Sequence, residues 1–321
     1  MHEPTIAVHL HEDEVTACLV EEVRAGFAAK PYELPPKWFY DERGSRLFDE
    51  ITRLAEYYPT RTEQRILDRH AADIAALTRA DTVIELGSGT STKTRTLLDA
   101  FAEAGALTRF VPFDVSAEVL TDAAQAIAER YRITVDAVVG DFHHHLDHLP
   151  TDGRRVIAFL GGTIGNFYPE ERRAFLSQLR ELCGPDGALL VGTDLVKDRA
   201  RLLAAYDDAG QVTAAFNRNV LRVVNRRLDA DFDETGFEHV ARFDEEGSFI
   251  EMALAATTAQ RVRIEDLDMT VEFDRGDEIR TEISTKFTLG GFADELAVAG
   301  FGRRDPFCDP DSDFALWLAR P

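Results

Sequence analysis

Between residues 81 and 194, short apolar runs alternate with stretches whose hydrophobic residues recur at helical spacing. The run 82–87 (TVIELG) ends in a glycine turn and is followed by the helical pattern of 91–105, so it predicts a strand–turn–helix unit. Four further apolar runs follow, at 109–115, 133–142, 154–162 and 188–195. Alternating strands and helices predict a parallel sheet that is covered by helices on both faces.

The C-terminal part of the chain follows a different order. The segment 292–301 (FADELAVAGF) predicts a helix that ends at Gly300, and the apolar strand 313–321 is reached through 305–313, whose Pro/Asp-rich composition predicts a turn. A helix with a two-strand ending completes a seven-stranded sheet whose last strand runs antiparallel. This α/β, Rossmann-like sheet is typical of the class I methyltransferases, which use S-adenosylmethionine (SAM).

Two segments outside this sheet predict a second domain. The insert 197–286 is far longer than an ordinary connection, and its polar/apolar alternation is typical of strands. We therefore expect a discontinuous SAM-binding domain and an α+β substrate-binding domain. The first consists of 63–196 and 287–321, and the second of 1–62 and 197–286.

Composition narrows the set of partners. The 321 residues are 45% hydrophobic, enough for a large core, and carry a formal net charge of −22. This charge repels nucleic acid and anionic membrane surfaces, so neither is an expected partner. Cys18, Cys183 and Cys308 lack any paired-ligand spacing, and the N-terminus has no secretory pattern, so we expect a cytoplasmic protein without disulfides or a metal site. We also expect a monomer.

The turn 85–90 (ELGSGT) contains the first candidate site. Gly87 and Gly89 let the backbone approach a ligand closely, but Thr92 and Lys93 stand where the dinucleotide fingerprint has its third glycine. Pyrophosphate binding is therefore weakly supported, whereas SAM has no phosphate and suits this turn better. A structural turn is the alternative.

Acidic residues end the next two predicted strands. Asp114 is placed where a carboxylate can accept hydrogen bonds from both ribose hydroxyls of an adenosine, with a helix N-cap as the alternative. Asp141 offers an acceptor for an adenine amino group, and Phe142 offers a ring for stacking on the base. Together with the glycine turn, these residues favour an adenosine-containing ligand.

Two predicted loops contain polar residues that allow either a structural or a ligand-binding interpretation. His143–His145 and His148 have the composition of a metal cluster, but adjacent side chains diverge on a helix or a strand, so we interpret them as a solvated loop. Asn166 can recognise the carboxylate or the amine of a small zwitterion, or cap the helix that begins near Pro169.

The stretch 281–285 (TEIST) predicts a strand in which Glu282 and Ser284 share one face. Glu278, Arg280 and Lys286 have the same parity, so periodicity alone interprets this face as the solvated side of an antiparallel strand. A ligand pocket is the alternative.

Six longer motifs carry a family resemblance. They are LPPKWFYDERGSRLFDEITRLAEYYPTRTE (34–63), VIELGSGTSTKTRTLL (83–98), FLGGTIGNF (159–167), GTDLVKD (192–198), AYDDAGQVTAAFNRNVL (205–221) and TEISTKF (281–287). Together they resemble the L-histidine Nα-methyltransferases of ergothioneine biosynthesis, over the chain from about residue 20 to the C-terminus. One departure is Gly162, where the family pattern has serine.

The resemblance implies roles for individual residues. The residues implied to hold SAM are Tyr40, Gly87, Lys93, Asp114, Asp141 and Phe142. Tyr57 is implied beside the reacting amine, with Gly161 as a second catalytic position. The residues implied to bind the acceptor, besides Tyr57, are Asn166, Tyr206 and Thr213 at the amino-acid end and Met252, Glu282 and Ser284 around the imidazole. Without the resemblance, Tyr57, Tyr206 and Met252 would be interpreted as core residues.

The resemblance also implies the reaction. SAM would trimethylate the α-amino group of L-histidine through mono- and dimethylated intermediates, giving hercynine and S-adenosylhomocysteine (SAH), with no metal. The alternatives are an N-methyltransferase of another aromatic amino acid such as tryptophan, a non-catalytic SAM-binding scaffold and an NAD-dependent oxidoreductase. The last would need a proton donor beside a hydride path, which the sequence does not present.

Overall fold

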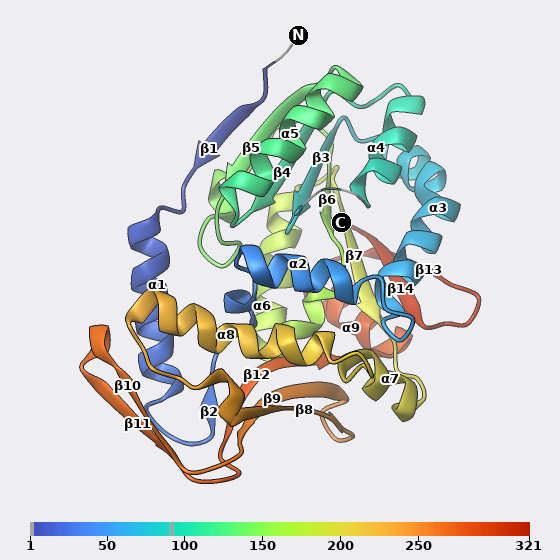
Figure 1. Ribbon diagram of the computed structural model, residues 1–321. Coiled ribbons are helices and arrows are strands. Elements are labelled where there is room, and N and C mark those ends of the chain that lie inside the picture. The colour runs from blue at the N-terminus through green and yellow to red at the C-terminus, as the bar shows by residue number, and fades with distance from the viewer. Residues whose placement is uncertain (1–2, 90, 92) are drawn as a thin grey trace. The chain divides into compact units, whose positions relative to one another are not determined.

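The computed structural model describes residues 3–89, 91 and 93–321. The chain forms two compact units, and Figure 1 shows their elements. The first unit contains Met1–His11, Pro59–Leu195 and Phe287–Pro321, and the second contains Glu12–Tyr58 and Val196–Lys286. Across the described ranges, no helix is both long enough and apolar enough to span a membrane.

A single sheet of eight strands forms the centre of the first unit. The strand order is β1-β5-β4-β3-β6-β7-β14-β13, and β14 is antiparallel to both of its neighbours. From β5 to β13 this is the predicted class I methyltransferase sheet, with its antiparallel strand. The strands are β1 (Thr5–Val8), β3 (Thr82–Leu86), β4 (Arg109–Asp114), β5 (Thr134–Val139), β6 (Arg155–Phe159), β7 (Ala188–Asp194), β13 (Arg303–Cys308) and β14 (Phe314–Arg320).

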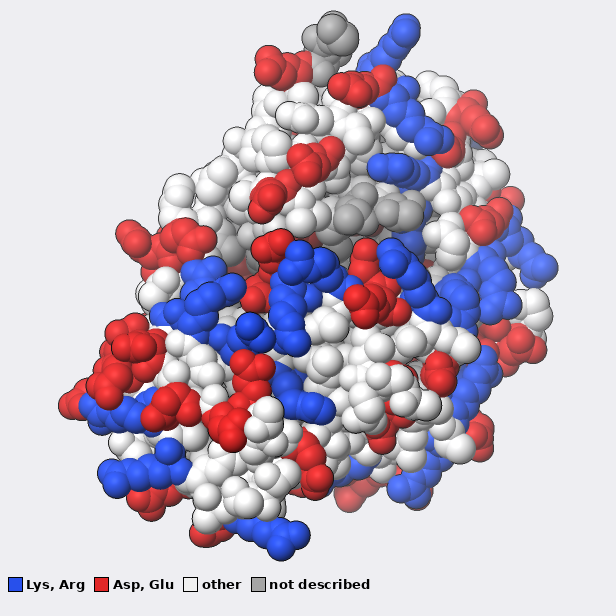
Figure 2. Space-filling view, viewed as in Figure 1, with Lys and Arg blue, Asp and Glu red and all other residues white. Residues whose placement is uncertain are grey.

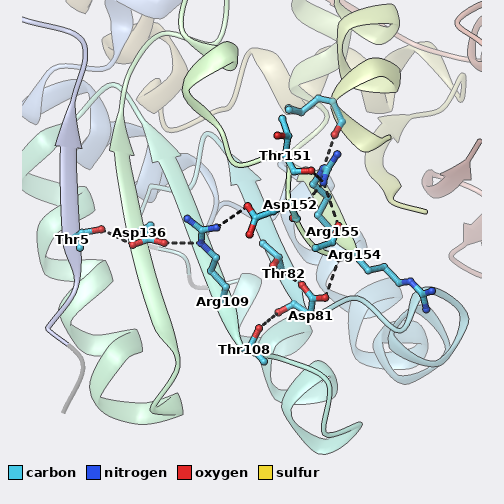
Figure 3. Close-up of polar contacts among 12 residues, drawn as sticks. Thr5, Asp81, Thr82, Thr108, Arg109, Asp136, Thr151, Asp152, Arg154 and Arg155 are labelled. Atoms are coloured by element: carbon cyan, nitrogen blue, oxygen red, sulfur yellow. Dashed lines mark hydrogen bonds and ion pairs between the residues drawn. The ribbon is translucent and has the colours of Figure 1, made fainter. Parts of the chain in front are cut away.

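The eighth strand, β1, adds to the seven that the sequence predicts and brings residues of the N-terminal extension into the first unit. It pairs in parallel with β5, from Thr5 opposite Asp136 to Val8 opposite Val139. Asp136 accepts hydrogen bonds from Thr5 Oγ1 at 2.5 Å and from Arg109 Nε at 2.6 Å, which joins β1, β5 and β4 in the row that Figure 3 shows. The strand exists because the edge of β5 offers unpaired backbone groups and a carboxylate.

Helices cover both faces of this sheet. Side chains of successive residues in a buried strand point to opposite faces, so Val83 packs in one core and Ile84 in the other. One face is covered by α3 (Pro59–Thr78), α4 (Thr94–Glu103) and α5 (Ala117–Tyr131), and the other by α6 (Pro169–Cys183) and α9 (Leu289–Val298). Two short 3₁₀ helices, η2 (Leu146–His148) and η3 (Thr163–Asn166), lie in the loops that follow β5 and β6.

The turn before the last strand is shorter than the sequence suggests. Residues 305–308, which were expected in the turn, belong to β13, because this strand pairs only with β14 and an edge strand tolerates Pro306. Asp309 closes the remaining turn. Its Oδ1 accepts hydrogen bonds from the amides of Asp313 at 2.8 Å and Phe314 at 2.9 Å.

The second unit is α+β and has its own hydrophobic core. A four-stranded sheet has the order β2-β12-β9-β8, and β10 pairs with β11. The strands are β2 (Tyr32–Glu33), β8 (Phe237–Asp244), β9 (Phe249–Ala256), β10 (Gln260–Ile264), β11 (Met269–Phe273) and β12 (Glu278–Thr285). The helices are α1 (Glu12–Gly26), η1 (Pro36–Phe39), α2 (Glu42–Ile51), α7 (Arg199–Tyr206), α8 (Val212–Leu228), η4 (Glu234–Gly236) and η5 (Glu265–Leu267).

Charged side chains of both signs share the surface. Figure 2 shows Lys and Arg beside Asp and Glu over the face that it draws. Ion pairs of the second unit include Arg226 with Asp41 at 3.1 Å and Arg227 with Glu12 at 2.6 Å. Basic side chains are thus neutralised locally within a chain whose net charge is −22.

Candidate functional site

The glycine turn follows β3 in the first unit. Gly87 and Gly89 have φ values of 70° and 47°, a left-handed backbone that favours glycine. A Cβ added at either position would meet no atom of the described residues within 4 Å, so these residues leave the space over this backbone open to a ligand. Thr90 and Thr92, which belong to the same motif, lie outside the described residues.

Asp114 ends β4 and contacts this turn. Its Oδ2 accepts a hydrogen bond from Gly89 N at 2.8 Å, and its Oδ1 accepts one from Ser116 N at 3.0 Å. Ser116 directly precedes α5, so the carboxylate also satisfies an amide at a helix start. Burial raises the pKa of Asp114, and hydrogen bonds from the Gly89 and Ser116 amides oppose this rise. These contacts support the interpretation of Asp114 as a residue that stabilises the turn and the helix start, and its role in ribose binding stays a prediction.

Glu85, within the turn motif, was given no role by the sequence argument. It is buried, and its carboxylate accepts hydrogen bonds from the hydroxyls of Ser88, at 2.6 Å, and of Thr94. Burial raises the pKa of Glu85 to about 7. Because Ser88 lies in the turn and Thr94 begins α4, Glu85 fixes the turn from both sides.

Glu63, Lys93 and Gly161 form a second cluster in the first unit. Glu63, on α3, has a fully buried side chain and forms an ion pair with Lys93 Nζ at 2.5 Å. Both of its carboxylate oxygens lie 2.9 Å from Gly161 N. The structure therefore brings together two residues implied for different ligands, through a glutamate that the sequence argument missed. No local pattern identifies Glu63, because its partners lie far along the chain.

The loop after β6 contains Gly161 and Asn166. Gly161 and Gly162 have φ values of 81° and 74°, so glycine suits position 162 better than the serine of the family pattern. Asn166 ends η3, and α6 begins at Pro169, as predicted. In residues 3–89, 91 and 93–321, no hydrogen bond involves the Asn166 side chain, which leaves its amide available to a ligand.

Asp141 and Phe142 lie just beyond β5. Asp141 is buried, and its Oδ1 accepts a hydrogen bond from His143 N at 2.9 Å. The Phe142 ring packs against Phe159 and Phe175, each with a centroid distance of 5.6 Å, so it also has a core role. In the histidine-rich loop that follows, His148 stacks on His9 at 3.7 Å.

In the second unit, β12 contains the stretch 281–285. Its antiparallel ladder with β9 shifts register between Arg280 and Glu282, so that Arg280 lies opposite Ala253 and Glu282 opposite Met252. Adjacent residues of β9 point to opposite faces, and cross-strand partners share a face. Arg280 and Glu282 therefore lie on opposite faces of the sheet. The prediction from strand alternation that Arg280 and Glu282 share a face is wrong, because a β-bulge at Thr281 adds one residue to β12.

The two faces of this sheet differ in their chemistry. On the face of Arg280, charged side chains pair with one another: Arg280 Nε lies 2.6 Å from Glu251 Oε2, and Arg242 Nη2 lies 2.5 Å from Glu278 Oε1. On the other face Glu282 has Met252, only 2% exposed, as its cross-strand neighbour. The Glu282 face is therefore not the ion-paired face.

Glu282 is a partly buried carboxylate. Within the part of the chain that the structure describes, no hydrogen-bond donor reaches it. Burial raises the pKa of Glu282 to about 7, and the positive charge of Lys286 opposes this rise. An N–H group of a ligand would satisfy this acceptor.

Ser284, Tyr206 and Lys286 form a buried triangle. Lys286 Nζ donates to Tyr206 Oη and to Ser284 Oγ, each at 2.8 Å, and the two hydroxyl oxygens are also 2.8 Å apart. Lys286 is only 2% exposed, so its interpretation as a solvated residue is wrong. The physical reason is that these two hydroxyls solvate its ammonium group. In the sequence, its place in TEISTKF is the only sign of this role.

A second polar network includes the backbone carbonyl of Tyr206. The Tyr206 carbonyl accepts a hydrogen bond from His239 Nε2 at 2.8 Å, and His239 Nδ1 accepts one from Asn217 Nδ2 at 2.8 Å. Burial lowers the pKa of His239, which keeps this ring neutral. Thr213, near the start of α8, has a buried side chain beside the Asp208 carboxylate, whose Oδ1 accepts a hydrogen bond from the Thr213 amide at 2.8 Å.

Tyr40 and Tyr57 belong to an aromatic group in the same unit. Their rings pack against Phe48 with centroid distances of 5.5 Å and 6.2 Å. Tyr57 lies 6.4 Å from the ring of Tyr206 and is buried, whereas Tyr40 is 39% exposed. Packing positions both rings, so their phenol groups have defined places within this unit.

The candidate residues divide between the two units. The first unit contains Gly87, Lys93, Asp114, Asp141, Phe142, Gly161 and Asn166. The second contains Tyr40, Tyr57, Tyr206, Thr213, Met252, Glu282 and Ser284. The first set fits an adenosine-containing ligand, since it combines open glycine backbone with carboxylates at the ends of neighbouring strands.

Comparisons with known proteins agree with this chemistry. A family model described as histidine-specific methyltransferase, SAM-dependent, matches residues 19–321. The histidine N-alpha-methyltransferase of Mycolicibacterium smegmatis is 54% identical over 316 residues, which are 98% of each chain. The enzyme of that name from Mycobacterium tuberculosis is 53% identical over the same share of each chain. Ergothioneine biosynthesis protein 1 of Neurospora crassa is 32% identical over 71% of this chain and 27% of its own length.

Proposed function

Because the chain belongs to the histidine-specific, SAM-dependent methyltransferase family, we propose that it methylates the α-amino group of L-histidine three times, to give hercynine. Mono- and dimethylated histidine are the intermediates, and SAH is the second product of each transfer. The relation to ergothioneine biosynthesis protein 1 supports a place in ergothioneine biosynthesis. The observation that carries the choice of histidine is the carboxylate of Glu282, which accepts no hydrogen bond from the described residues and lies on the face of β12 opposite the Arg280–Glu251 ion pair.

The first unit would hold SAM, which supplies a methyl group on a sulfonium. Gly87 offers open backbone, Asp114 would accept hydrogen bonds from the ribose, and Asp141 would accept one from the adenine amino group. Lys93, Phe142 and, in the second unit, Tyr40 complete the proposed set for this ligand. The open space at the glycine turn supports this assignment.

The residues of the second unit would hold the acceptor. Glu282 would accept an imidazole N–H, and Ser284 would bond the other ring nitrogen, beside the apolar wall of Met252. Tyr206 and Thr213 would contact the amino-acid end of the acceptor, and both side chains are buried within this unit. In the first unit, Gly161 and Asn166 are the residues proposed for the amino-acid end.

The chain contributes positioning and proton removal to the reaction. The attack of an amine on a methyl group needs no covalent enzyme intermediate, and correct orientation alone accounts for several kcal/mol of barrier reduction, about 7–11 at most. Each transfer requires a neutral amine, so a proton must leave before each of the three steps. Tyr57 would relay it to water, accepting the proton from the amine as it passes its own on, because its ring is fixed by packing and its phenol is the proposed neighbour of the amine.

The decisive experiment incubates the protein with SAM and each of the twenty amino acids and analyses the products by mass spectrometry. Histidine should give products with one, two and three added methyl groups. A comparable methyl ladder from tryptophan would favour the alternative acceptor, and binding of SAM without any methylated product would indicate a scaffold. Binding of NAD in place of SAM would overturn the methyltransferase assignment.

Composition supports part of the proposed cellular setting. The net charge of −22 supports a protein that binds neither nucleic acid nor anionic membranes, and three cysteines that are free in the structure support a cytoplasmic one. That the protein is a monomer stays a prediction. Size-exclusion chromatography with light scattering tests the monomer.

A further inference from the structure

The buried lysine of the triangle, Lys286, contacts two proposed substrate residues, yet the proposed mechanism gives it no task. Its ammonium group can only donate hydrogen bonds. Tyr206 Oη and Ser284 Oγ therefore both accept from it, at 2.8 Å each. This contact fixes what the two hydroxyl groups can still offer to a ligand.

Each hydroxyl oxygen has one hydrogen and two acceptor sites. One site on Ser284 is filled by Lys286, and the Tyr206 hydroxyl, 2.8 Å away, can fill the other. A phenol is a stronger donor than an alcohol, and accepting a hydrogen bond from an ammonium group strengthens its donation further. The triangle therefore favours the arrangement in which Tyr206 donates to Ser284. In that arrangement Ser284 has only its own hydrogen left, so it must act as a donor.

We propose that Lys286 is a positioning residue that determines specificity by making Ser284 a hydrogen-bond donor. The pocket then combines a donor, Ser284, with an acceptor, Glu282, on one face of β12. This inference rests on the proposed function, because it concerns how the proposed acceptor site recognises its ring.

The pairing of one donor with one acceptor defines the ring that fits. A neutral imidazole has one N–H and one acceptor nitrogen, and it satisfies both side chains in a single tautomer. An imidazolium has two N–H groups, one of which would face the Ser284 hydrogen. A pyrrole ring has an N–H but no acceptor nitrogen, so it would leave Ser284 unsatisfied. Lys286 therefore selects for the acceptor nitrogen without contacting the ring.

The test compares Lys286→Met, Ser284→Ala and the double variant, with histidine and pyrrolylalanine as methyl acceptors. Lys286→Met should raise the KM for histidine by about ten- to a hundredfold, the range for hydrogen bonds involving a charged group. It should leave the affinity for SAM within about twofold and reduce the preference for histidine over pyrrolylalanine. The double variant is measured at pH about 9, where Glu282 remains ionised without the charge of Lys286. If Lys286 acts through Ser284, then adding Lys286→Met to Ser284→Ala should cost only about threefold or less at that pH. If instead the KM of the double variant rises by the product of the two single-variant effects, Lys286 does not act through Ser284 and the proposal is wrong.

Lys197→Met is the matched control. Lys197 donates to Tyr58 Oη at 2.7 Å and lies over its ring, so this variant also removes a lysine–tyrosine contact of the second unit, one outside the proposed pocket. It should leave the KM for histidine unchanged. An equal rise in both variants would show that any lost lysine–tyrosine contact perturbs the unit, and would contradict the proposal.

A measurement on the native protein remains decisive if Lys286→Met fails to fold. Histidine labelled with ¹⁵N, bound with SAH at pH about 7.5, should show a single neutral tautomer by NMR, whereas free imidazole at that pH exchanges between its two tautomers. A bound imidazolium would overturn the role of Lys286. Absence of methylated histidine from the native protein would overturn the proposed function itself, and this inference with it, whereas failure of the inference alone leaves native turnover intact.

Discussion

Replacement of Glu63 by glutamine should destabilise the first unit. Glu63 is fully buried and accepts from Lys93 Nζ at 2.5 Å and from Gly161 N at 2.9 Å. Glutamine keeps an oxygen for Gly161 but removes the charge that pairs with Lys93. Loss of one partner of a buried ion pair costs about 3–5 kcal/mol. Because the Lys93 side chain is 25% exposed and can recover some hydration, we expect about 2–4 kcal/mol.

The assay can isolate this unit, because the chain has two tryptophans and only Trp317 belongs to the first unit. In a Trp38→Phe background, urea unfolding followed by fluorescence reports on buried Trp317. The midpoint should fall with the m-value unchanged. Adding Lys93→Met should restore part of the loss, because no unpaired charge remains. A loss below about 0.5 kcal/mol, the usual range for a neutral surface change, would refute the reasoning.

Four further predictions concern binding. Asp114→Ala should lower the affinity for SAM, measured by calorimetry, by about ten- to a hundredfold, because charge-assisted hydrogen bonds are lost. An unchanged affinity would show that Asp114 does not bind SAM. Asn166→Ala should raise the KM for histidine, and histamine, which lacks a carboxylate, should be a poor substrate; histamine turnover equal to that of histidine would contradict this. Glu282→Ala should weaken histidine binding by about 1.5–3 kcal/mol, leave SAM binding unchanged and reduce the preference for histidine over tryptophan as methyl acceptor. If this variant keeps the native preference, the imidazole binds elsewhere. The ionised carboxylate of Glu282 is a stronger acceptor than the protonated acid, and its pKa is raised to about 7, so histidine affinity should fall as pH drops through 7; in Glu282→Gln only the titration of the substrate imidazole should remain, and an identical pH profile would contradict this.

The central sheet was predictable because its strands are buried on both faces. Such strands are continuous apolar runs, as in Thr82–Leu86 and Arg155–Phe159, and the helices between them have a regular spacing of apolar residues. β1 was not predictable in the same way. All four of its residues are exposed, and it forms only because the edge of β5 and the carboxylate of Asp136 are available.

The candidate site was predictable where a residue follows a strand, as with Asp114 at the end of β4. It was not predictable where it depends on register. The bulge at Thr281 moves Glu282 to the face opposite Arg280, and nothing in the alternation of TEIST reveals the extra residue. Glu63 was missed for a related reason. It lies on α3, and it meets Lys93 and Gly161 only after the sheet has formed.

The carboxylate of Glu282 indicates how selectivity would arise. Glu282 is partly buried, so water can reach its carboxylate in the ligand-free protein, and a ligand that supplies an N–H replaces that water when it binds. An apolar ring of similar size would leave the carboxylate unpaired and would displace whatever water relieves it. Discrimination of this kind is large, because sites built to bond a polar group reject analogues that lack it by factors of about 10⁴–10⁵, whereas an extra methylene changes binding by only about 10–200-fold. The specificity of this protein for an imidazole would then follow mainly from the cost of binding other rings, and much less from the attraction of the correct one.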